Sequence, residues 1–101
     1  MKQVEIIPQF NSAIVSADTL VATGAGVVHT VTFSQADAAP TAGSFTLYDN
    51  TSEAGTAIIS HTFTIDVFHP TTIVLDAVFN NGLYAGFDTT DDVYVTITYK
   101  Q

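Results

Sequence analysis

Three histidines are the first residues whose chemistry could make a metal site. His29, His61 and His69 show neither the i, i+4 spacing of a helical zinc pair nor the spacing of a two-histidine, one-carboxylate site. His29 alternates with Val27 and Val31, so we interpret it as a hydrogen-bonded histidine of a strand. A histidine zinc site stays open only across an oligomer axis.

A cluster of aspartates is the second candidate. Asp88, Asp91 and Asp92 lie in one short segment, and oxygen-rich loops can bind calcium. The spacing is not that of an EF-hand loop, however, and Asp-Thr-Thr-Asp-Asp is typical of a solvated hairpin turn. We therefore expect no bound metal and no cofactor, and these three aspartates are the alternative within one chain.

Catalysis is not indicated by the residue types present. The chain has no cysteine and no Gly-x-Ser-x-Gly elbow, so we expect it not to be an enzyme. Paired carboxylates for glycoside hydrolysis stay open, because such residues meet only in three dimensions. Sugar binding by stacking is also open, although tyrosine on alternating strand positions more often lies in a core or an interface. Its candidates are Tyr48, Tyr84, Tyr94 and Tyr99.

Charge restricts the partners. Two basic residues stand against ten acidic ones, a net charge of -8, so a nucleic-acid partner and an anionic membrane are not expected. Only 12% of the residues are charged, 47% are hydrophobic, and the mean hydropathy is +0.31. We infer that part of the surface is buried in an oligomer. The N-terminus does not resemble a signal peptide, and we expect synthesis in the cytoplasm of the host cell.

The elements that must position these residues are strands, because apolar and polar residues alternate throughout the chain. Eight antiparallel strands in one domain of 101 residues predict an all-β, jelly-roll-like sandwich. Asn81-Gly82 predicts a type I′ hairpin turn. Residues 1–20 could form an N-terminal arm. The expected strands are Val4 to Ile7, Ala13 to Ser16, Val27 to Phe33, Ser44 to Tyr48, Ala57 to Asp66, Thr72 to Val78, Leu83 to Phe87 and Val93 to Tyr99. The expected core residues are Phe45, Leu47, Ile65, Leu75, Val95 and Ile97.

Four segments in a fixed order carry a resemblance to a known group of proteins. They are Gly43 to Ser52 (GSFTLYDNTS), Gly55 to Ile58 (GTAI), Phe79 to Tyr84 (FNNGLY) and Val93 to Tyr99 (VYVTITY). This order resembles small jelly-roll head decoration, or cement, proteins and fibre-type virion proteins of tailed bacteriophages. The resemblance does not extend to the residues before Gly43.

The resemblance implies a virion protein on the outer capsid surface. It implies a homotrimer at or near three-fold axes that clamps neighbouring subunits of the major capsid protein. The rival functions are a carbohydrate-binding or adhesion module on a fibre, and a tail or baseplate component. We place the contact surface on the expected hairpin and on the N-terminal segment. The residues concerned are Phe79, Asn81, Leu83, Tyr84 and Phe87, with Ile6, Ile7 and Phe10.

Overall fold

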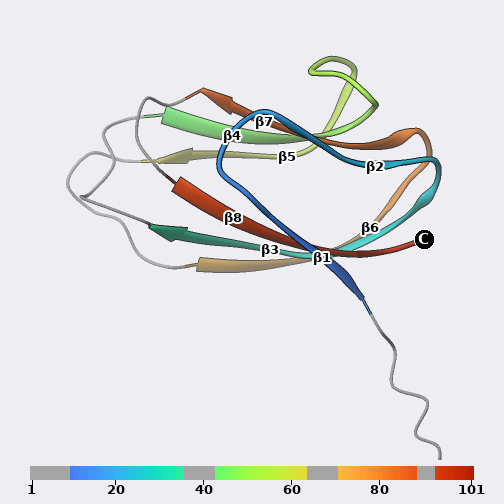
Figure 1. The fold of residues 1–101 in the computed structure, drawn as a ribbon, viewed down its shortest axis with the longest axis horizontal. Helices are drawn as coiled ribbons and strands as arrows, with labels where there is room; N and C mark the ends of the chain where they lie inside the picture. Colours follow the sequence, from blue (N-terminus) through green and yellow to red (C-terminus); the bar gives the residue numbers. More distant parts are fainter. Residues whose placement is uncertain (1–9, 36–42, 64–70, 89–92) are drawn as a thin grey trace, which may run out of the picture.

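The protein is a sandwich of two four-stranded antiparallel sheets. The computed structural model describes residues 10–35, 43–63, 71–88 and 93–101, which contain eight strands and no helix. We call the sheet with strand order β1-β8-β3-β6 sheet A and the sheet with order β2-β7-β4-β5 sheet B. Figure 1 shows them as two stacked layers. The strands are β1 (Asn11–Val15), β2 (Thr19–Thr23), β3 (Gly26–Gln35), β4 (Gly43–Asp49), β5 (Thr56–Phe63), β6 (Thr71–Phe79), β7 (Gly82–Asp88) and β8 (Val93–Lys100).

The strand pairing follows a simple rule. β4 pairs with β5, β3 with β6, β2 with β7 and β1 with β8, as in one long hairpin that has been rolled up. Rolling brings β8 beside β3 and β7 beside β4, which closes the two sheets. This is the jelly-roll-like sandwich that the alternation of residues predicts.

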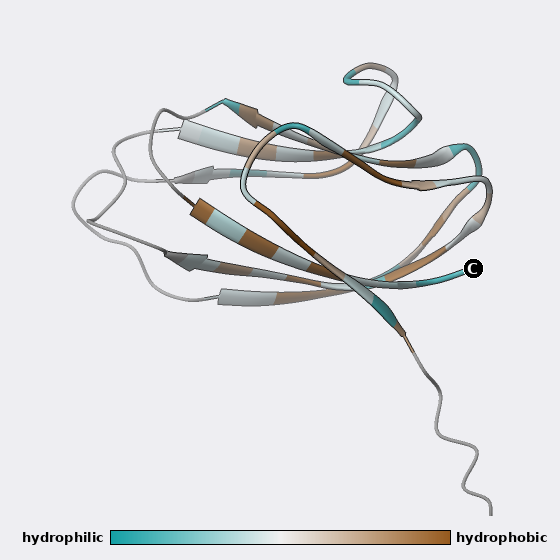
Figure 2. Cartoon of the chain, viewed as in Figure 1, coloured by the Kyte–Doolittle hydropathy of each residue, from teal (hydrophilic) through white to brown (hydrophobic). Residues whose placement is uncertain are grey.

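Alternating residues place one side of each strand in the core. In β8, Val93, Val95 and Ile97 are fully buried, and the intervening residues point outward. Figure 2 shows this alternation of hydrophobic and polar residues along β8. Among the expected core residues, Phe45, Leu47, Val95 and Ile97 are fully buried, and Leu75 packs against them at the margin of the core. Ile65 lies outside the described residues.

Three phenylalanines fill the centre of the sandwich. Phe33, Phe45 and Phe79 are the largest fully buried side chains of the described residues. Phe33 and Phe45 come from different sheets, and their rings meet edge to face with centroids 5.5 Å apart. Such an aromatic pair contributes about 0.5–1.5 kcal/mol beyond the burial of its area, so it helps to fix how the sheets face each other.

Most of the expected strands are present at nearly the expected positions. The segment Val4 to Ile7 lies outside the described residues, as does the end of the strand expected over Ala57 to Asp66. β2 (Thr19–Thr23) was not expected from the sequence. It is a short strand at the edge of sheet B, paired only with β7.

The prediction of a hairpin at Asn81-Gly82 is wrong. β6 and β7, which this turn joins, lie in different sheets and do not pair. A type I′ turn needs positive φ at both central residues, but Asp76 is the one residue other than glycine with positive φ in the described ranges. The turn is a corner between the sheets. Glycine is required at Gly82 because a Cβ there would lie 2.7 Å from the carbonyl oxygen of Ala22.

Candidate functional site

The outward side chains of sheet A form a flat surface, which we call the neutral face. Strand register places its residues in rows across the sheet: first Ile14, Thr96, Thr32 and Thr72, then Ser12, Thr98, Thr30 and Val74, then Lys100, Val27 and Val78. Thr30 and Thr98 share a hydroxyl hydrogen bond of 2.5 Å, and Thr32 and Thr72 share one of 3.0 Å. The hydroxyl groups of these four threonines are therefore satisfied within the sheet.

Exposed apolar side chains gather on this face. Seven large hydrophobic residues of the described chain are exposed, and six of them belong to sheet A or to the residue before it. The exposed fraction reaches 70% at Ile14, 63% at Val74 and 67% at Val78. Scattered apolar residues are ordinary on a protein surface, whereas a gathering on one sheet face is typical of a contact surface. The six are Phe10, Ile14, Val27, Val74, Val78 and Tyr94.

An irregularity in β3 and β6 brings three polar or aromatic groups together on the neutral face. The register shifts between Val28 and Thr30, so His29 is an extra residue relative to β8. His29 Nδ1 and Asp76 Oδ1 are 2.5 Å apart, and the Phe10 ring stacks on the imidazole at 4.5 Å. Asp76 has a φ of 46°, a value that aspartate tolerates better than most residues. The bulge thus places a carboxylate among apolar residues and gives it a partner.

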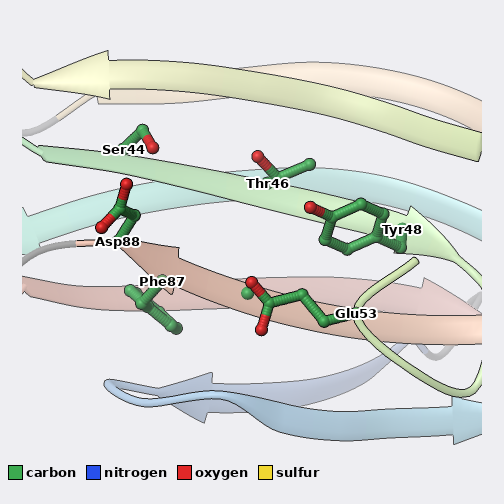
Figure 3. Close-up of a pocket in the computed structure, with 7 residues that line it drawn as sticks. Ser44, Thr46, Tyr48, Glu53, Phe87 and Asp88 are labelled. Atoms are coloured by element: carbon green, nitrogen blue, oxygen red, sulfur yellow. The ribbon is translucent and has the colours of Figure 1, made fainter. Parts of the chain in front are cut away.

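The outward side of sheet B has a different character, because it carries an acidic hollow of about 240 Å³. Figure 3 shows Asp88 and Ser44 at one end, Tyr48 at the other, and Glu53 reaching over β7 from the connection between β4 and β5. Gly86 forms part of the floor, where a Cβ would lie 3.1 Å from the Tyr48 ring and 3.2 Å from the Glu53 carboxyl carbon. The lining residues are Ser44, Thr46, Tyr48, Glu53, Gly86, Phe87 and Asp88.

Neighbouring acidic groups change the pKa of a glutamate in this hollow. A hydrogen bond with Asp18 and the negative charges of Asp18 and Asp88 raise the pKa of Glu53 above its ordinary value of 4.5. Asp18 also accepts the backbone N–H of Phe87 at 2.7 Å, which ties the β1–β2 connection to β7. The hollow can accept hydrogen bonds from hydroxyl or ammonium groups. In the described part of the chain, no three histidine, aspartate or glutamate side chains are grouped to hold a metal ion.

The structure corrects part of the expected contact surface. Phe79 and Leu83 are fully buried in the core, so these side chains cannot contact a partner. Tyr84 and Phe87 are half-buried, and Phe87 packs edge to face on Phe45 with centroids 5.1 Å apart. The hairpin pattern was misleading because its two strands belong to different sheets.

Two further residues of the expected surface are exposed. Asn81 lies at the corner turn, and Phe10 lies on the neutral face with 41% of its surface exposed. Ile6 and Ile7 lie outside the described residues. The structure therefore places the exposed members of the expected set on separate parts of the molecule.

The candidate metal ligands that the structure describes, His29, His61 and Asp88, form no group that could hold a metal ion. His29 is hydrogen-bonded, as the sequence predicts, and His61 stacks on Phe33 with ring centroids 4.5 Å apart. Asp88 lines the acidic hollow. His69, Asp91 and Asp92 lie outside the described residues.

Sequence reasoning missed the residues that define both surfaces. Asp18 and Glu53 lie in connections that are far from Asp88 in the sequence, and no local residue spacing predicts that they approach it. The exposure of Val74 and Val78 could have been predicted from the sequence around them. The run Ile73 to Phe79 is apolar on both sides of the strand except at Asp76, which is typical of a strand covered on both faces.

The described residues contain no helix long and apolar enough to cross a membrane. Two surfaces of opposite character remain as candidate sites, the neutral face of sheet A and the acidic hollow of sheet B. Comparison with protein-family models, with curated protein sequences and with solved structures finds no match to this chain.

Proposed function

We propose that this chain is a structural virion protein that decorates the outer surface of a tailed-phage capsid as a homotrimer. Its role is to bind neighbouring subunits of the major capsid protein and to stabilise the shell. It acts through surface contact and has no catalytic role. The observation that carries the proposal is the neutral face, where sheet A and the residue before it expose six apolar side chains.

The distribution of charge supports an assembly role. The chain carries a net charge of -8. Among the described residues, the neutral face carries one acidic side chain, Asp76, with His29 beside it, and one basic side chain, Lys100. The hollow of sheet B gathers Asp18, Glu53 and Asp88 on the other side of the sandwich. A protein with one face free of repulsion and one acidic face can pack inward and still keep decorated particles apart.

Binding to capsids tests the proposal directly. The purified protein is mixed with undecorated heads assembled from the major capsid protein of its own phage, and the heads are pelleted. We expect saturable co-sedimentation, because several weak contacts in an oligomer add to a tight attachment. The matched control is the same protein with unexpanded heads, which present a different surface. Protein that stays in the supernatant at every ratio would contradict the proposal.

A second candidate function is sugar binding at the acidic hollow. Hydroxyl groups of Ser44 and Thr46, the phenol of Tyr48 and two carboxylates line one depression, a set that can bind a polyol through hydrogen bonds. This function predicts saturable binding on a glycan array that is lost in Tyr48→Ala and kept in Tyr94→Ala, whose change lies on the opposite sheet. An array without signal for the parent protein removes this candidate.

A further inference from the structure

Three of the six exposed apolar residues of the neutral face lie on its two edge strands. Ile14 lies on β1, and Val74 and Val78 lie on β6; these are the two edge strands of sheet A. Phe10 comes immediately before β1, and its ring stacks on His29 of β3. We call the exposed side of β1 with Ile14 the β1 margin, and the exposed side of β6 with Val74 and Val78 the β6 margin. Three strand spacings of roughly 4.8 Å separate β1 from β6, so the two edge strands are about 14 Å apart.

The centre of the face between them is polar and needs no partner. Thr30, Thr32, Thr96 and Thr98 occupy the middle of β3 and β8, and their hydroxyls include the pairs bonded within the sheet. Val27 and Tyr94 are exposed nearer the ends of these strands. The middle of the face is thus polar, and exposed apolar side chains surround it.

This arrangement does not suit two copies stacked face to face. Such a two-fold contact buries the centre of the patch most completely, and interface centres are normally apolar with polar rims. The neutral face shows the reverse order. It suits a cyclic contact, in which one margin of each copy meets the other margin of the next copy.

Strand direction and charge agree with a cyclic contact. All pairs in sheet A are antiparallel, so β1 and β6 run in opposite directions, and they meet antiparallel between copies when the ring axis is parallel to the strands. Asp76 lies between Val74 and Val78 on β6, whereas Lys100 is on β8 next to β1. The two charges of the face therefore lie on opposite halves, and the contact brings unlike charges toward each other.

We propose that copies of this chain assemble in a ring by packing the β1 margin of one copy against the β6 margin of the next. The number of copies, three, rests on the proposed function. The occupant of the neutral face is therefore a second copy of the chain. The bulge at Asp76 interrupts the regular edge of β6, so the contact is made by side chains and not by extension of the sheet.

Two single substitutions test this contact, one on each margin. Ile14→Asp and Val78→Asp change residues that are 70% and 67% exposed, so the fold is retained and its melting curve verifies this. Light scattering after size exclusion gives the mass of each. We expect three chains for the parent and one chain for either variant. Leu20→Asp is the matched control, because Leu20 is exposed on sheet B, and it should keep the parent mass.

Mixing the two variants separates a ring from a face-to-face pair. Ile14→Asp retains an intact β6 margin and Val78→Asp retains an intact β1 margin, so an equimolar mixture should form a complex of two chains and no larger one. A parent protein that is a monomer or a dimer overturns the ring, and so do variants that remain trimers or a mixture that remains monomeric.

The outcome is independent of capsid binding. A parent trimer that fails to bind heads removes the proposed function and leaves the ring in place. Variants that stay trimeric and still bind heads remove the ring and leave the proposed function in place.

Discussion

Asp49 holds the corner turn between the sheets through its carboxylate. Its oxygens accept the backbone N–H groups of Asn80 at 3.0 Å and Asn81 at 2.8 Å. Asp49→Ala leaves these exposed donors to water, and we expect a loss of about 0.5–1.5 kcal/mol of unfolding free energy in urea. Asp49→Asn retains one acceptor oxygen and should lose less. An Asp49→Ala protein as stable as the parent would contradict a stabilising role for these hydrogen bonds.

The same carboxylate predicts a pH dependence. The hydrogen bond from Asn81 contributes most to holding the pKa of Asp49 below its ordinary value of 3.8, with Asn80 and Gly82 acting in the same direction. A lowered pKa gives stability that is present above pH 3.8 and is lost as the pH falls through the folded value. Melting curves of the parent should show this loss in acid. The difference between parent and Asp49→Asn should shrink over the same range.

Glu53 contributes to stability with the opposite pH dependence. Its raised pKa means that the folded state binds a proton more readily than the unfolded state, so this contribution to stability is lost as the pH rises above 4.5. Glu53→Gln should therefore raise the melting temperature at pH 7, and the gain should disappear below pH 4.5. Asp88→Asn removes a weaker source of the same repulsion and should act in the same direction with a smaller gain. A Glu53→Gln protein that melts below the parent at pH 7 would contradict this electrostatic account.

At the scale of the element, alternate residues of β4 point into the core. A substitution at Leu47 tests this orientation. Leu47 is fully buried and has no charged partner in the core of the described residues. Leu47→Asp should unfold the domain, because an unpaired buried carboxylate costs several kcal/mol or more. Ala57→Asp makes the same substitution at an exposed residue of β5 and should remain folded by circular dichroism.

The bulge in β6 depends on a residue that accepts positive φ. Asp76→Val places a β-branched residue at a φ of 46° and should lower the unfolding free energy by about 1–3 kcal/mol. Asp76→Asn should be close to the parent, since asparagine tolerates this region. His29→Ala removes the hydrogen bond with Asp76 and leaves the backbone unchanged. It therefore separates the effect of this hydrogen bond from that of backbone strain at residue 76. Urea titrations of the three proteins give the comparison.

Local alternation was sufficient to predict the strands whose two sides differ. β8 is the clearest case, since its valines and isoleucine are buried and its threonines point outward. β2 was missed because five residues between two turn segments carry too little alternation to be distinguished from a connection. Asn81-Gly82 was misread because the local turn signal is independent of which sheet each strand joins. That choice depends on pairings between distant strands, and so does the approach of Asp18, Glu53 and Asp88.

At the scale of the whole molecule, the net charge predicts how association between copies depends on salt. Association through the neutral face works against the repulsion between copies that each carry a net charge of -8. Salt screens this repulsion, with a Debye length of about 10 Å at 0.1 M ionic strength. We expect the proportion of assembled protein in sedimentation velocity to rise with sodium chloride. Dissociation by salt would instead indicate that the attraction between Asp76 and Lys100 dominates the contact.

The rolled hairpin also determines when the protein can fold during its synthesis. β8 is the last of the eight strands to leave the ribosome, yet it lies inside sheet A between β1 and β3. β1 has β8 as its one neighbour in the sheet, so the first strand made must wait for the last. Pairing between such distant segments is slow compared with local pairing. A nascent chain interrupted before β8 would leave Val31 and Phe33 without the strand that pairs beside them, and exposed apolar residues of this kind make a chain prone to aggregation.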